Sequence, residues 1–205
     1  HPPQPPFWGS RVVRDVPLER VFEYINETAL IRGQWRVIRG SMDEKEYRSI
    51  LEEQVYPEFR ELKSQALSLA LLEPQVAYGY FPCRSDGDEV IVYYPPEDLQ
   101  GVDQASLKEW HRFSFPRQMK DRKLCIADFF APVQSGKVDV LPCHVVTVGE
   151  RASEYAKKLY AANKYKDYLY FHGLAVETAE ALAELWHKRI REELGIAGKD
   201  APEIK

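Results

Sequence analysis

The chain has 205 residues, of which 44% are hydrophobic and 12% aromatic, and this is enough to bury one substantial core. A formal net charge of −4 leaves no general basic surface, which argues against a nucleic-acid partner held through phosphates. No apolar run approaches the ~20 residues that span a bilayer, and the start of the chain lacks the regions of a signal peptide. We therefore expect a cytoplasmic protein with no membrane partner. The odd count of 3 cysteines, without a short paired spacing, favours free thiols, whose role the sequence leaves open.

The chain opens on a proline-dense segment, HPPQPP. Such a segment is typical of an extended, semi-rigid spacer, so we assign residues 1–6 to an interdomain linker and 7–205 to one domain. A short strand is expected at 11–13.

A short amphipathic helix is predicted over 18–25, with Asp15 as its acidic cap and its end near Asn26. The next segment, 29–35, mixes apolar residues with a cation, an amide and an indole. Either Trp35 plugs the edge of the core, or this segment lines a pocket for a flat ligand.

Residues 43–72 keep the period of one apolar helix face, which predicts a long helix. Pro57 lies inside it and lacks a backbone N–H, so it must kink the helix or split it in two. Pro74 closes the segment.

Apolar runs rich in β-branched and aromatic residues predict strands at 75–81 and 89–94, joined as a hairpin by a polar turn. A further alternating strand is expected at 110–115. These strands favour a largely antiparallel sheet.

Two more runs, 124–130 and 138–148, are predicted to form an antiparallel pair in the middle of the sheet, reversing at 135–137. Asp128 interrupts the first run. A buried, unpaired carboxylate is costly, so Asp128 must lie at the rim of the sheet, as a capped strand end, or be bound to a partner.

After Gly149 the pattern is helical, over 150–168 and again over 174–194, and Gly195 ends the last helix. Helices and strands that do not alternate regularly indicate an α+β fold, with a twisted antiparallel sheet flanked by long helices. Glu184 and His187 have the spacing of a di-metal motif, but no second copy exists, so we assign no metal ligand. We also assign no catalytic residue.

Several segments, in this order and spacing, resemble the C-terminal activation domain of cobalamin-dependent methionine synthase. They are YGYFP at 78–82, GD at 87–88, FPRQ at 115–118, CIADF at 125–129, SG at 135–136, and a helix with GLA at 173–175, EALAE at 180–184 and HKR at 187–189.

The resemblance implies a reactivation domain that binds S-adenosylmethionine and presents it to a cobalamin held by a neighbouring domain of the same polypeptide. Flavodoxin, or a similar reductase, would supply the electron for reductive methylation of cob(II)alamin. The whole enzyme would transfer a methyl group from methyltetrahydrofolate to homocysteine.

Two positions of the family can be carried over. Asn26 stands where the family often has an aspartate that faces the amino group of the ligand, and Glu180 matches a carboxylate near the pocket. The resemblance therefore implies that Asn26 and Glu180 bind S-adenosylmethionine.

The family's Arg-x-x-x-Gly-Tyr segment, which holds the carboxylate of the ligand, does not occur before Lys205. We expect the sequence to be truncated at its C-terminal end; otherwise it would bind S-adenosylmethionine poorly. Two alternatives stay open: a docking domain for a corrinoid protein without S-adenosylmethionine binding, and an independent small-molecule enzyme that uses Cys83 or Cys125.

Overall fold

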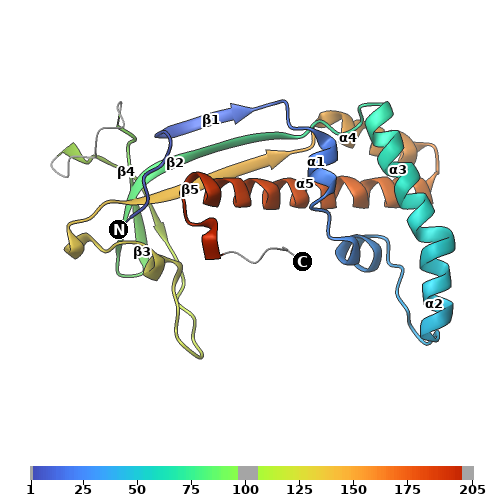
Figure 1. Cartoon of the computed structure of the whole chain (residues 1–205), viewed down its shortest axis with the longest axis horizontal. Coiled ribbons are helices and arrows are strands. Elements are labelled where there is room, and N and C mark those ends of the chain that lie inside the picture. Colours follow the sequence, from blue (N-terminus) through green and yellow to red (C-terminus); the bar gives the residue numbers. More distant parts are fainter. Residues whose placement is uncertain (1, 97–105, 200–205) are drawn as a thin grey trace. The chain divides into compact units, whose positions relative to one another are not determined.

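The computed structural model describes residues 2–96 and 106–199, and these form two compact units. Unit 1 consists of the described residues within His1–Val12, Ala77–Val145 and His187–Ala201, and unit 2 of those within Val13–Val76 and Val146–Trp186. The assignment of one domain to 7–205 stays a prediction. Figure 1 labels the elements along the chain.

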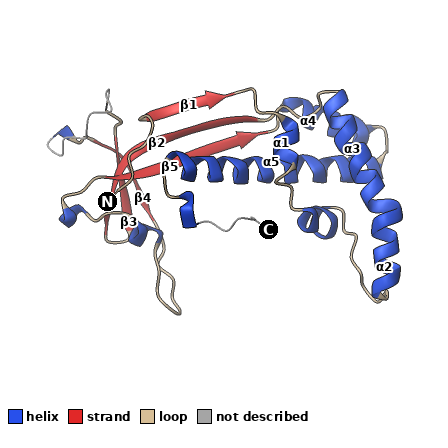
Figure 2. Cartoon of the chain, in the orientation of Figure 1, coloured by secondary structure: helices blue, strands red, loops and turns tan. Residues whose placement is uncertain are grey.

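The described strands form a five-stranded sheet, in which the order is β1-β2-β3-β4 and β5 also pairs with β2 (Figure 2). The pairs β2–β3 and β3–β4 are antiparallel, and Ser85 lies opposite Val90. The predicted hairpin is confirmed, and Gly87 supplies the positive φ of its turn. The bounds are β1 Gly9–Val13, β2 Gln75–Asp86, β3 Glu89–Tyr93, β4 Glu109–Ser114 and β5 Asp139–Thr147.

The core of unit 1 is built on β2 and β3. Cys83 is fully buried, and Val90 and Val92 pack in the same cluster. Gly79 in β2 lies so close to β1 that a Cβ there would collide with the backbone of Gly9, so this position requires glycine.

The predicted strand at 124–130 is wrong. The chain there forms a 3-10 helix, η4 (Ile126–Phe129), followed by a second one, η5 (Val133–Ser135). The reason is a polar contact: the side chain of Asp128 accepts the backbone N–H of Cys125 at 2.9 Å and closes a capping turn that competes with an extended strand.

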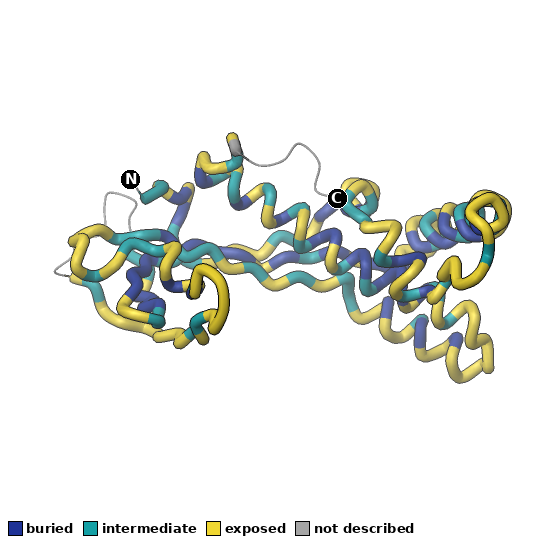
Figure 3. The backbone as a smooth tube through the Cα atoms, turned by 90° about the horizontal axis from the view of Figure 1, so that it is seen from below, coloured by how far each residue is buried: buried dark blue, intermediate teal, exposed yellow. Residues whose placement is uncertain are grey.

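Unit 2 is helical in its described part. It contains α1 (Leu18–Phe22), the π-helices η1 (Ala29–Gln34) and η2 (Leu51–Val55), α2 (Glu44–Ile50), α3 (Tyr56–Ser68) and α4 (Glu150–Ala161), and most of α5 (Tyr165–Glu193), whose last residues belong to unit 1. Figure 3 shows buried and exposed residues alternating along the helical segments.

The first helix is shorter than expected, and its predicted cap is wrong. Pro17 occupies the N-cap position of α1 without a side-chain hydrogen bond, because Asp15 lies too far before the first turn.

The long helix at 43–72 is split rather than continuous. Asp43 caps α2 by accepting the N–H of Glu46 at 2.7 Å, and the π-helical η2 then leads into α3. Pro57 lies in the first turn of α3, where its missing N–H costs no helical hydrogen bond.

The break between the last two helices also lies earlier than predicted. Asn163 has a positive φ of 58° and separates α4 from α5. As expected, Gly195 adopts the left-handed conformation after α5.

The described residues of the proline segment belong to unit 1. Pro5 is buried, and the ring of Phe7 meets Tyr78 and Tyr80 edge-on at centroid distances of 5.4 and 5.0 Å. Its role as a linker stays a prediction. None of the helices within 2–96 and 106–199 has the length and apolar character that a bilayer crossing needs.

Candidate functional site

Asn26 lies in unit 2, three residues before η1 begins at Ala29, and its side chain is exposed. Its Oδ1 accepts the N–H of Ala29 at 3.0 Å, and its backbone oxygen accepts the N–H of Leu30 at 2.9 Å. A cavity of about 640 Å³, in the size range of small-molecule sites, is lined by residues 22–28, Asn26 included.

The helix η1 that follows Asn26 is π-helical, since the N–H of Trp35 bonds to the oxygen of Leu30, five residues back, at 2.9 Å. Turns of this kind are rare and occur often at functional sites. This π-helix places the side-chain amide of Gln34 and the indole of Trp35 in contact with α5.

Trp35 plugs the core, as the first of the two alternatives predicted. It is 3% exposed, its ring stacks on Tyr170 at 4.5 Å, and its Nε1 donates to the backbone oxygen of Tyr170 at 2.9 Å. The edge contact with Phe59 completes this packing. Trp35 therefore offers no open face to a flat ligand.

Gly173 on α5 permits this close approach. A Cβ at Gly173 would lie 2.8 Å from the Cβ of Gln34 and 3.0 Å from Nε1 of Trp35. One turn later, Nε2 of Gln34 donates to Oε1 of Glu177 at 3.3 Å. The contact between η1 and α5 thus fixes the amide that meets Glu177.

Glu177 is a buried carboxyl group that the sequence reasoning missed, and it is only 3% exposed. Burial raises its pKa, the hydrogen bond from Gln34 opposes this, and the charge of Glu180 raises the pKa further. The burial of Glu177 could have been predicted from its position in the sequence, because the buried residues Leu174 and Thr178 lie on either side of it on the apolar face of the helix.

Glu180 follows Glu177 by three residues and so lies on the same side of α5. Its side chain is exposed and makes no hydrogen bond or ion pair with the residues that the structure describes. The structure links Asn26 to Glu177 through η1, but Glu180 is not among the described lining of the cavity at Asn26. Ligand binding by Asn26 and Glu180 stays a prediction.

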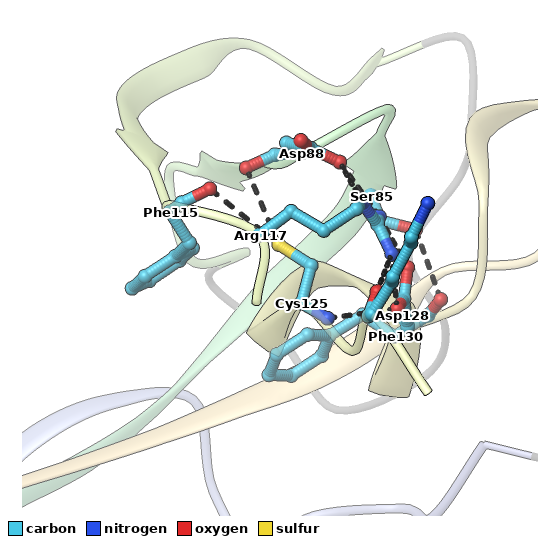
Figure 4. Close-up of polar contacts among 8 residues, drawn as sticks. Ser85, Asp88, Phe115, Arg117, Cys125, Asp128 and Phe130 are labelled. Carbon is cyan, nitrogen blue, oxygen red and sulfur yellow. Dashed lines mark hydrogen bonds and ion pairs between the residues drawn. The ribbon is translucent and has the colours of Figure 1, made fainter. Parts of the chain in front are cut away.

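Unit 1 contains a second polar cluster, centred on Arg117 (Figure 4). Nη2 of Arg117 lies 2.6 Å from Oδ1 of Asp88 and 2.7 Å from Oδ1 of Asp128, and Nη1 donates to the oxygen of Lys123 at 2.7 Å. The hydrogen bonds from Arg117, and then that from the N–H of Cys125, lower the pKa of Asp128 to about 2. Asp128 is therefore bound to a partner, and the cluster fastens η4 to the β2–β3 hairpin.

The thiols do not support a cysteine-dependent enzyme. Cys83 is fully buried, and burial raises its pKa, so little thiolate forms near neutral pH. Cys125 is also buried, and its Sγ lies 3.6 Å from the backbone oxygen of Phe115. Within the described residues, no group of three or more His, Cys, Asp or Glu side chains could hold a metal ion.

The chain matches the family model described as vitamin B12 dependent methionine synthase, activation domain, over residues 17–203. Methionine synthase of Mycobacterium tuberculosis (strain ATCC 25618 / H37Rv) is 40% identical over 206 residues, which cover 97% of this chain and 17% of that protein. The Mycobacterium leprae (strain TN) methionine synthase is 36% identical over 203 residues, which cover 96% of this chain and 16% of that protein. The chain therefore spans less than a fifth of the length of these relatives.

Among solved structures, the MetH reactivation domain bound to AdoHcy is similar with a TM-score of 0.79. The match has 23% sequence identity and covers 98% of this chain and 61% of that chain. This likeness confirms the predicted α+β fold.

Proposed function

The chain belongs to the activation-domain family of vitamin B12-dependent methionine synthase, and from this premise we propose that it binds S-adenosylmethionine and positions it for reductive methylation of a cobalamin. The cobalamin would be held by another domain of the same polypeptide. The whole enzyme would be a cobalamin-dependent methyltransferase that moves a methyl group from methyltetrahydrofolate to homocysteine in the cytoplasm. Flavodoxin or a similar reductase would supply the electron.

The observation that carries the proposal is the family match over 17–203, which includes Asn26 and Glu180. The similar solved structure is described as bound to AdoHcy, the product that S-adenosylmethionine leaves after methyl transfer. In this chain, a cavity at Asn26 and an exposed carboxylate at Glu180 supply polar groups that suit such a ligand.

S-adenosylmethionine, when bound, supplies a methyl group on a positively charged sulfur and also carries an ammonium and a carboxylate. The carboxylate of Glu180 has no competing partner among the described residues and is free to accept hydrogen bonds from the ammonium. Oδ1 of Asn26 accepts the N–H of Ala29 and has a second lone pair, with which it could accept a hydrogen bond from the ammonium. The chain thus binds and orients the ligand, and the chemistry takes place between the two cofactors.

Calorimetric titration of S-adenosylmethionine tests the proposal, on this chain and on a version extended past Lys205. We expect Glu180→Gln to weaken binding by about 1 kcal/mol or more, as for the loss of a charge-assisted hydrogen bond. Glu61→Gln, at an exposed position of α3, is the matched control and should bind as the wild type does.

Absence of binding in both lengths would refute the proposal and leave the docking domain as the better account. Unchanged affinity of Glu180→Gln in the extended version would remove Glu180 from the site.

A further inference from the structure

Arg84 in β2 is a buried cation without an acidic partner. It is 9% exposed, its Nε donates to the backbone oxygen of Lys137 at 3.0 Å, and its buried Nη2 makes no hydrogen bond within the described residues. No carboxylate in the described part of the chain forms an ion pair with it. Because an uncompensated buried charge is costly, this part of unit 1 favours a negative charge nearby.

Lys137 connects Arg84 with a cavity of about 620 Å³, whose described lining belongs to unit 1. The ammonium of Lys137 makes no hydrogen bond or ion pair with a residue that the structure describes. Arg191, near the end of α5, lines the same cavity, and its Nη2 donates to the backbone oxygen of Ile196 at 3.3 Å. Two cations therefore border the cavity, and the charge of Arg84 lies behind the wall that Lys137 forms.

Asp139 is the one carboxylate in the described lining of this cavity. Its Oδ2 accepts the N–H of Ala131 at 2.9 Å, and its Oδ1 accepts the N–H of its neighbour Val140 at 2.8 Å. Both oxygens thus hold the backbone of the wall. The cations outnumber this single carboxylate, so the cavity attracts an anion.

Most of the other lining residues are apolar. Phe129 is 72% exposed and Ile196 is 42% exposed, which leaves an aromatic ring and an aliphatic side chain open to water. The apolar lining continues with Phe130, Pro132, Val140, Pro142 and Leu194. A ligand with an apolar body gains free energy by covering such surface, and the volume of the cavity lies in the range of small-molecule sites.

The wall that carries Lys137 is held by hydrogen bonds. Oγ of Ser135 donates to the backbone oxygen of Pro132 at 2.6 Å and accepts the N–H of Lys137 at 3.2 Å. Oγ of Ser85, in β2, donates to the backbone oxygen of Phe130 at 3.0 Å. A wall that is already ordered lowers the entropic cost of binding a ligand.

We propose that this cavity binds an aromatic organic anion, with a flat apolar body and one oxyanion group such as a carboxylate or a phosphate. The oxyanion pairs with the ammonium of Lys137, and the aromatic body covers Phe129. Neither Asn26 nor Glu180 belongs to the described lining. The site is therefore separate from the one proposed for S-adenosylmethionine and does not depend on it.

Two fluorescent probes with the same aromatic body test the proposal. Anilinonaphthalene sulfonate carries an oxyanion, and phenylnaphthylamine is its neutral counterpart. In fluorescence titrations of this chain, Lys137→Gln should weaken binding of the sulfonate by about fivefold or more and leave the neutral probe unchanged. Phe129→Ala should weaken binding of both probes. The matched controls Lys120→Gln and Ile126→Ala, at exposed positions outside the lining, should bind both probes as the wild type does.

Absence of saturable binding of the sulfonate to the wild type would overturn the proposal, and this result does not depend on how well a variant folds. An equal loss for both probes in Lys137→Gln, or no loss for the sulfonate, would also overturn it. Displacement of the sulfonate by S-adenosylmethionine would contradict a separate site, and loss of binding in the version extended past Lys205 would show that the cavity is filled. If S-adenosylmethionine alone fails to bind, the proposed function fails and this inference stands.

Discussion

Replacement of Gly173 by alanine tests the close contact between η1 and α5. A Cβ at this position would lie 2.8 Å from the Cβ of Gln34 and 3.0 Å from Cδ1 of Trp35. Neither atom is the free end of a flexible side chain, so α5 or η1 must move. We expect the displacement to loosen the hydrogen bond between Gln34 and Glu177 as well.

Two effects of opposite sign decide the stability of Gly173→Ala. Alanine in place of glycine inside a helix stabilises by about 1 kcal/mol. Forcing a methyl group into a well-packed contact costs about 1–3 kcal/mol. The overpacking outweighs the helix propensity, and the free energy of unfolding should fall by about 1 kcal/mol, which lowers Tm by about 2–4 °C in a chain of this size.

Gly33, within η1, is the matched control. It has no atom within 4 Å of the position where a Cβ would lie, and its φ is not positive. Gly33→Ala should therefore show the helix-propensity gain without a clash and stabilise the protein by up to about 1 kcal/mol. Urea unfolding followed by circular dichroism measures both variants.

A Gly173→Ala variant that is as stable as Gly33→Ala, or more stable, would contradict the close contact between η1 and α5. That result would mean that the two elements separate at no cost, and the contact could not hold Gln34 against Glu177.

Two further predictions concern unit 1. Glu193→Ala removes the acceptor that lies 2.7 Å from the hydroxyl of the buried Tyr80. Leaving that hydroxyl without a hydrogen bond should lower the free energy of unfolding in urea by about 1–3 kcal/mol. The control Glu192→Ala, at an exposed neighbouring position, should change this free energy by less than about 0.5 kcal/mol. Equal effects of the two variants would count against the buried hydrogen bond. Hydrogen bonds, chiefly from Arg117, lower the pKa of Asp128 from 3.8 to about 2. The ionised Asp128 therefore stabilises the fold fully above pH 3.8, and this stabilisation is lost as the pH falls towards about 2. Between these two pH values, Asp128→Asn should lose less stability than the wild type does, as measured by acid unfolding followed by fluorescence. Identical acid-unfolding profiles of the two proteins would contradict the ion pair between Asp128 and Arg117.

The sequence predicted elements best where the determining interactions are local. The β2–β3 hairpin follows from two β-branched runs and a glycine turn, and Pro57 marked the interruption of the long helix. The segment 124–130 has the composition of a strand, yet its conformation is decided by polar contacts of Asp128, one of them with Arg117, 11 residues earlier in the chain. Apolar patterning does not include such contacts.

The candidate site was predictable only in part. Asn26 and Glu180 came from a family resemblance, because an exposed amide and an exposed carboxylate have no distinctive spacing. Glu177 was missed because its partner, Gln34, is 143 residues away in the chain. A helical pattern places Glu177 near the apolar face but does not reveal what it meets there.

The π-helical turn of η1 has a consequence for how the protein tolerates changes in length. Its closing bond spans five residues instead of four, so the turn holds one residue more than an α-helical turn. Since each helical residue advances by about 100°, removing that residue would rotate Gln34 and Trp35 out of phase with α5. Insertions and deletions in this short stretch should therefore be far less neutral than in an ordinary surface loop.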